Sequence, residues 1–149
     1  MNELSATISH AAPQSRSTSP GSPRKALLIA GASRSGTSVL SCLLHALGAS
    51  VPELLLGPAH GNPTGHWEPK ALVTLNEEIL AAMGMSWRDP RPIPSAWFYS
   101  SPAHDFLCRI THQIQSDFGT SPLIVIKDPR LARLLPLYLK VLFSPSNRW

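Results

Sequence analysis

The segment Gly31–Ser38 reads GASRSGTS and combines small residues, hydroxyl side chains and one arginine. Small residues let a backbone turn sharply, so that its amide groups converge on one anion. The helical pattern that follows would point its positive dipole end at the same place. We therefore expect this segment to bind phosphate or sulfate, the alternative being an ordinary Gly/Ser-rich turn. The expected ligand-binding residues are Ser33, Arg34, Ser35, Gly36, Thr37 and Ser38.

The same segment has the outline of a Walker A loop, but Thr37 stands where that motif has its lysine. The lysine normally reaches the β and γ phosphates, and no acidic residue on a second strand is evident to hold magnesium. These departures argue against a magnesium-dependent kinase or NTPase. An atypical P-loop phosphotransferase stays open as an alternative, with Arg34 as its cation.

Alternating apolar segments must position this loop. Ala26–Ala30 and Leu123–Ile126 are short apolar runs that suit strands buried on both faces, and a third strand is expected near residues 49–51. Between them, apolar residues recur at helical spacing, first at Val39, Leu40, Leu43, Leu44 and Leu47. Strands that alternate with amphipathic helices predict an α/β fold with a parallel sheet.

Further helices are expected to begin at Pro69 and Pro102, and the second of these should end at Gly119. The segment 131–143 is also apolar at helical spacing, but Pro136 predicts a kink or two short helices. Residues 51–68 form a loop of a length that is often functional. We expect both cysteines, which lie within helical patterns, to be buried thiols.

Composition narrows the class of protein. The chain has 149 residues, of which 43% are hydrophobic, enough for one domain. Residues 1–23 are rich in Ser, Ala, Pro and Thr and are expected to form a disordered tail, with the ordered domain at 24–149. No run reaches the roughly 18 to 20 apolar residues of a membrane span, and the N-terminus lacks a signal peptide's apolar stretch. We therefore expect a cytoplasmic protein without a membrane span.

The formal charge of +4 suits a small anionic ligand as well as a polynucleotide, and we expect no nucleic-acid partner. Because histidine commonly binds metals, His60, His66, His104 and His112 are candidate metal ligands. His60 and His66 share one loop, but neither belongs to a Cys/His cluster or an HExxH pattern. The sequence therefore predicts no metal site.

Three motifs resemble the sulfotransferase family. Arg34–Ser38, RSGTS, matches the family's 5′-phosphosulfate loop, which binds 3′-phosphoadenylyl sulfate (PAPS). Gly61–Pro69, GNPTGHWEP, and Val125–Leu131, VIKDPRL, are similar to elements of bacterial sulfotransferase-like proteins at similar spacing. The resemblance covers about residues 26–143. It implies a P-loop-type three-layer α/β/α fold with a parallel sheet.

The resemblance also implies a chemistry. PAPS would be the co-substrate, and its sulfuryl group would pass without a metal to an alcohol or amine of a small-molecule or carbohydrate acceptor. Arg34 would stabilise the leaving phosphate, Lys127 would point toward the sulfate, and Glu68 would be the base. Two alternatives stay open: Glu68 as a cap of the helix at Pro69, and Lys127 as a solvated lysine beside an Asp128/Arg130 pair. His66 is a second candidate base.

One part of the family pattern has no counterpart here. The family binds the 3′-phosphate with an arginine at the end of a further strand and a serine several residues later. In relatives that strand closely follows the helix after the K-D-P-R element, and residues 144–149 contain no such pair. We therefore expect the chain to be an apparently truncated, N-terminal portion of a sulfotransferase-like domain. A truncated, catalytically inactive fragment is the alternative.

Overall fold

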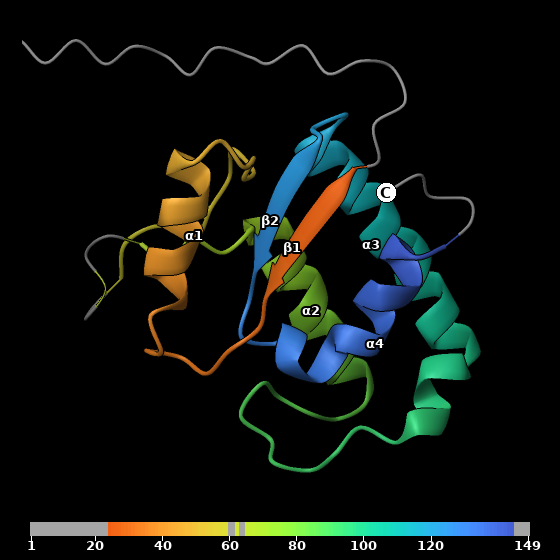
Figure 1. Ribbon diagram of the computed structural model, residues 1–149. Coiled ribbons are helices and arrows are strands. Elements are labelled where there is room, and N and C mark those ends of the chain that lie inside the picture. The colour runs from red at the N-terminus through yellow and green to blue at the C-terminus, as the bar shows by residue number, and fades with distance from the viewer. Residues whose placement is uncertain (1–23, 60–61, 63–64, 145–149) are drawn as a thin grey trace, which may run out of the picture.

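The computed structural model describes residues 24–59, 62 and 65–144, so the tail expected at residues 1–23 lies outside the described residues. In this described part of the chain, four α-helices, a 3-10 helix and a parallel pair of strands form a small mixed α/β fold, which confirms the predicted class (Figure 1). None of the described helices is long and apolar enough to cross a membrane. The elements follow in the order β1 (Lys25–Ile29), α1 (Thr37–Ala46), α2 (Lys70–Ala82), η1 (Ser95–Tyr99), α3 (Ser101–Phe118), β2 (Leu123–Lys127) and α4 (Leu131–Leu142).

The sheet is built around β2. Strand β1 pairs with it in parallel, with Leu27 opposite Val125. On the other side of β2, Ser50 forms a parallel bridge with Ile124. The Ser50 N–H donates to the Leu123 carbonyl, and the Ser50 carbonyl accepts from the Val125 N–H, each at 2.9 Å. The third strand expected near residues 49–51 is therefore present as a single bridge.

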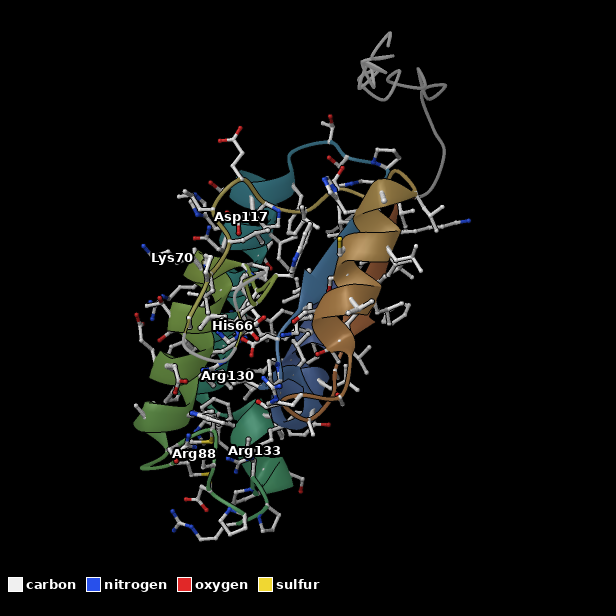
Figure 2. All side chains as sticks on the ribbon, turned by 90° about the vertical axis from the view of Figure 1, so that its left-hand side faces the viewer. His66, Lys70, Arg88, Asp117, Arg130 and Arg133 are labelled. Carbon is white, nitrogen blue, oxygen red and sulfur yellow. The ribbon has the colours of Figure 1, made fainter. Side chains whose placement is uncertain are left out.

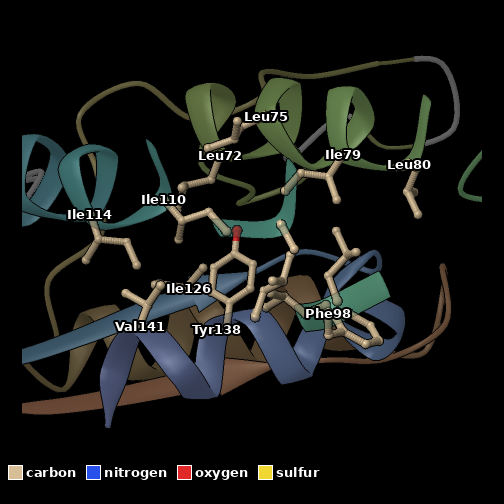
Figure 3. Packing of buried hydrophobic residues seen from close by; sticks show 14 of the residues in the cluster. Leu72, Leu75, Ile79, Leu80, Phe98, Ile110, Ile114, Ile126, Tyr138 and Val141 are labelled. Carbon is tan, nitrogen blue, oxygen red and sulfur yellow. The ribbon is translucent and has the colours of Figure 1, made fainter. Parts of the chain in front are cut away.

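Helices cover both faces of this sheet. Helix α1 packs over β2 on one face, where Leu44 contacts the small cluster formed by Ile29, Ala49 and Val125. Helices α2, α3 and α4 lie on the other face and enclose the main core (Figures 1 and 3). The fully buried members of the main core include Leu72, Ile79, Leu80, Ile110, Ile114, Ile124, Ile126, Leu131, Leu134, Leu137 and Tyr138.

The prediction that both strands are buried on both faces is confirmed for β2 and wrong for β1. Leu27 in β1 is 38% exposed, because α1 packs over β2 and covers this face of β1 only near Ile29. The apolar face expected for α1 is also largely exposed, since Ser41 and Leu44 are the residues that turn toward the sheet. The exposed apolar residues of α1 and its C-terminal cap are Val39, Leu40, Leu43 and Leu47.

Two local expectations differ from the structure. Cys42 and Cys108 are both exposed, because each lies on the outward side of its helix, so their expected burial is wrong. The segment around Pro136 forms the single helix α4, so the alternative of two short helices is wrong, whereas the kink expected at Pro136 stays a prediction. Helix α3, in contrast, begins at Ser101 beside Pro102 and ends before Gly119, close to the predicted bounds.

A polar link crosses the main core. Tyr138 is fully buried, and its hydroxyl points from α4 toward α2 (Figure 3). The hydroxyl donates to Asn76 Oδ1 at 2.9 Å, and Asn76 Nδ2 donates to Asp128 Oδ2 at 2.8 Å. Burial raises the pKa of Tyr138 above its ordinary value, so the phenol remains a proton donor at neutral pH. This chain joins α4 and α2 to the residue that follows β2.

We expect Tyr138→Phe to lower the free energy of unfolding by about 1–3 kcal/mol, because it leaves the buried Asn76 carbonyl oxygen without its donor. Tyr99→Phe is the matched control. The Tyr99 side chain is 81% exposed, so its change should stay within about 0.5 kcal/mol. Urea unfolding followed by circular dichroism measures both. Equal values for the two variants would contradict the buried link.

Candidate anion-binding site

The loop between β1 and α1 turns tightly at the end of β1. Arg34 and Gly36 have positive φ angles of 66° and 82°. A Cβ atom on Gly31 would lie 2.9 Å from Thr37 Cγ2, so any side chain there would clash with the start of the helix. The Ser35 hydroxyl donates to the Ala32 carbonyl at 2.6 Å and closes the turn. Such an arrangement of positive φ angles orients backbone N–H groups toward an anion.

Helix α1 begins directly after this loop. Within the described residues, no side chain caps it and its first turn contains no acidic residue. The first N–H groups of a helix have no acceptor inside the helix, and the helix dipole makes this end positive. Ser38 turns its hydroxyl to the His66 carbonyl, 3.1 Å away. The start of α1 can therefore accept a negatively charged group.

A cavity of about 250 Å³ lies against the start of α1. It joins three parts of the chain that are distant in sequence: the loop, the segment near His66 and the end of β2. A larger cavity, of about 670 Å³, lies between α2 and α3 and contains none of the predicted site residues. The residues that line the smaller cavity are Arg34, Gly36, Thr37, Ser38, Val39, Asn62, His66 and Lys127.

The structure thus brings most of the predicted site residues together. The lining includes four of the six predicted loop residues, together with Lys127 at the end of β2. Ser33 and Ser35 are exposed and do not line the cavity. Glu68 does not line it either, but lies against Lys127.

Lys127 and Glu68 form a buried ion pair. The Lys127 ammonium donates to Glu68 Oε1 at 2.5 Å and to the His66 carbonyl at 3.0 Å. The two side chains are only 4% and 7% exposed. The reading of Lys127 as a solvated lysine is therefore wrong, and its ammonium is held at the back of the cavity.

Arg130 extends the pair into a network. Its guanidinium contacts Asp128 Oδ1 at 2.8 Å and Glu68 Oε2 at 3.6 Å, and its Nε donates to Glu77 Oε1 at 2.6 Å. Burial lowers the pKa of Arg130, but Asp128 and Glu77 outweigh this effect and raise the pKa above its ordinary value. The Asp128/Arg130 pair expected as an alternative therefore exists, and Glu68 also contacts the Arg130 guanidinium.

Both carboxylate oxygens of Glu68 face cations, Oε1 toward Lys127 and Oε2 toward Arg130. They are therefore not directed at the first turn of α2, as a helix cap would require. Helix α2 is preceded by Pro69, and no side-chain hydrogen bond caps its first turn within the described chain. The reading of Glu68 as a helix cap is therefore wrong. The catalytic role expected for Glu68 stays a prediction.

His66 lies between α1 and α2, with Arg130 nearby (Figure 2). Its Nδ1 is 4.0 Å from Glu68 Oε1, and its side chain is 37% exposed. The neighbouring Trp67 has a positive φ of 57° and packs its ring against His45 at 5.8 Å. This backbone conformation holds the His66 carbonyl where Ser38 and Lys127 both donate to it.

Sequence reasoning missed the residues that support the network from behind. Asn76 lies on the buried face of α2, among Leu72, Leu75 and Ile79. A polar residue at a position of apolar spacing was the available signal, because a buried amide requires partners. Glu77, which accepts from Arg130, carried no such signal.

Comparisons with protein-family models, with curated proteins and with solved structures give no match. Among the described residues, no three His, Cys, Asp or Glu side chains are grouped so that they could hold a metal ion.

We expect Glu68→Gln to lower the free energy of unfolding by about 3–5 kcal/mol, because it leaves Lys127 buried beside a neutral amide. Glu78→Gln is the matched control. It removes the same charge from an exposed pair with Arg109, so its cost should be below about 1 kcal/mol. Chemical denaturation of both variants checks this difference. Similar small losses would show that the Glu68 pair does not hold the site.

Proposed function

We propose that this chain has a P-loop-type three-layer α/β/α fold and acts as a PAPS-dependent sulfotransferase. The observation that carries the proposal is the cavity at the start of α1, where Arg34 and Lys127 meet the loop backbone. Its described lining contains no carboxylate. A site with cations, helix N–H groups and no acid favours a phosphate or sulfate group, and PAPS carries both.

The proposed reaction moves a sulfuryl group from PAPS to an alcohol or amine of a small-molecule or carbohydrate acceptor. The acceptor oxygen or nitrogen forms a bond to sulfur, and the bond between sulfur and the bridging phosphate oxygen breaks. The electron pair of that bond stays on the phosphate of the leaving adenosine 3′,5′-bisphosphate. Arg34 and the first N–H groups of α1 stabilise this charge, and no metal is required.

The acceptor must also lose a proton. His66 lines the cavity, whereas Glu68 lies behind Lys127. We therefore assign the removal of this proton to His66, with Glu68 beside it as the carboxylate that stabilises the protonated ring. Lys127, held by Glu68 and the His66 carbonyl, supplies fixed positive charge at the end of β2.

The proposal is tested first by binding. Adenosine 3′,5′-bisphosphate is titrated by calorimetry without magnesium into the wild type, Arg34→Ala and Arg88→Ala. We expect Arg34→Ala to weaken binding at least about tenfold, because hydrogen bonds to charged groups contribute about 1.5–3 kcal/mol. Arg88 is exposed and does not line the cavity, so Arg88→Ala should bind as the wild type does. Equal affinity in all three proteins would show that Arg34 does not bind the ligand.

The same titration separates the alternatives. An atypical phosphotransferase would bind ATP in a magnesium-dependent manner and would not prefer adenosine 3′,5′-bisphosphate. A catalytically inactive fragment would bind the bisphosphate but would not convert PAPS in the presence of alcohol, phenol, sugar or amine acceptors.

If PAPS is converted, we expect His66→Ala to lower turnover by about 100-fold or more, as the loss of a general base does. The affinity for adenosine 3′,5′-bisphosphate should stay close to that of the wild type. Chromatographic measurement of the bisphosphate released from PAPS checks the rate. Unchanged turnover would return the role of base to Glu68.

A further inference from the structure

The segment that precedes α2 has a backbone irregularity at Trp67. This segment runs antiparallel to residues 54–56, and in a regular antiparallel ladder a residue exchanges both of its backbone hydrogen bonds with one residue opposite. Here the Leu56 carbonyl accepts from the His66 N–H at 3.1 Å, whereas the Leu56 N–H donates to the Glu68 carbonyl at 2.8 Å. Three residues therefore oppose Leu56, and Trp67 lies at the centre of a bulge. Bulges re-aim the groups around them and are frequent next to active sites.

Trp67 adopts a strained conformation in this bulge. Its φ angle is 57°, which brings the Cβ atom of a residue with a side chain close to its own backbone. Among the described residues other than glycine, Arg34 and Trp67 are those with positive φ. Arg34 lines the cavity, and Trp67 follows His66, which also lines it. Strain of this kind persists only where the surrounding structure maintains it, and it is concentrated at functional sites.

The φ angle of Trp67 sets the orientation of the peptide group that contains the His66 carbonyl. In the observed conformation this carbonyl accepts from Lys127 Nζ at 3.0 Å and from the Ser38 hydroxyl at 3.1 Å. Rotation of Trp67 to an extended conformation would turn the carbonyl away from both donors. The Lys127 ammonium, which is almost fully buried, would then lose one of its acceptors.

The side chain of Trp67 packs on α1. The centroids of the Trp67 and His45 rings are 5.8 Å apart, and His45 Nδ1 donates to the Ala49 carbonyl at 3.0 Å. The contact of two aromatic rings contributes a free energy of the same order as the cost of one strained residue. The ring pair is therefore strong enough to maintain the bulge. Trp67 itself does not line the cavity.

We propose that Trp67 is a positioning residue of the anion-binding site. Its ring, held against His45, keeps Trp67 in the left-handed conformation. This conformation directs the His66 carbonyl to Lys127 and Ser38, so Trp67 acts on the site without touching the ligand. The choice of adenosine 3′,5′-bisphosphate as the ligand rests on the proposed function, whereas the geometry around Trp67 does not depend on the reaction.

Glycine and alanine at position 67 separate positioning from a contact with the ligand. Both lack the ring, but glycine adopts a positive φ without strain and alanine does not. In calorimetric titrations with adenosine 3′,5′-bisphosphate, we expect Trp67→Ala to weaken binding at least about fivefold, because affinity falls with the fraction of competent molecules. Trp67→Gly should recover most of this loss. Equal losses in both variants, or a loss in neither, would overturn the proposal.

Hydrogen exchange tests the positioning without a ligand. The His66 and Leu56 N–H groups exchange slowly only while both hydrogen bonds of the bulge are formed. We expect both amides to exchange at least about fivefold faster in Trp67→Ala than in Trp67→Gly. A role in packing alone would give equal rates in the two variants and would overturn the proposal. A wild type that binds no bisphosphate would contradict the proposed function, and these rates would still decide the role of Trp67.

The ring contact is tested from the side of α1. His45→Ala and His45→Phe both lose the hydrogen bond to the Ala49 carbonyl, but only phenylalanine keeps a ring opposite Trp67. We expect His45→Ala to accelerate exchange at the His66 amide about threefold or more, as the loss of an aromatic pair implies, and His45→Phe to stay near the wild-type rate. Equal rates in these two variants would overturn the role assigned to the rings.

Discussion

The buried pair of Lys127 and Glu68 is the interaction on which the candidate site depends. The Lys127 ammonium also donates to the His66 carbonyl, and that carbonyl accepts from Ser38 at the start of α1. The end of β2, the segment before α2 and the anion-binding loop are thus joined around one carboxylate and one carbonyl. A buried charge without a partner is strongly unfavourable, so separating any of these three segments would cost the contacts of Lys127 or Glu68.

The charges of the site are arranged in two layers. Glu68 and Asp128 lie behind the cavity, where they form ion pairs with Lys127 and Arg130. The described lining of the cavity carries only neutral and cationic side chains. Buried cations are stabilised by the carboxylates on one side, while the cavity on the other side remains favourable for an anion. The acidic layer is in turn held to the core through Asn76 and Tyr138.

Burial is uneven across the sheet. Strand β2 lies between α1 and the main core, whereas β1 is covered mainly on the face of α2, α3 and α4. The position of α1 over β2 explains two exposed apolar surfaces. One is Leu27 of β1, and the other is formed by the outward leucines of α1 itself. The site and the exposure of Leu27 therefore both depend on the position of the same helix.

The sequence alone determined the local features. Apolar spacing, Pro102 and Gly119 predicted α3, and the glycines of Gly31–Ser38 predicted the tight loop, because such features depend on neighbouring residues. Only the tertiary structure decided which apolar faces are covered and which partner Glu68 takes. Lys127 lies 59 residues from Glu68 in the sequence, and their contact exists because the end of β2 and the segment before α2 meet in space. The spacing of residues along one element carries no information about such a contact.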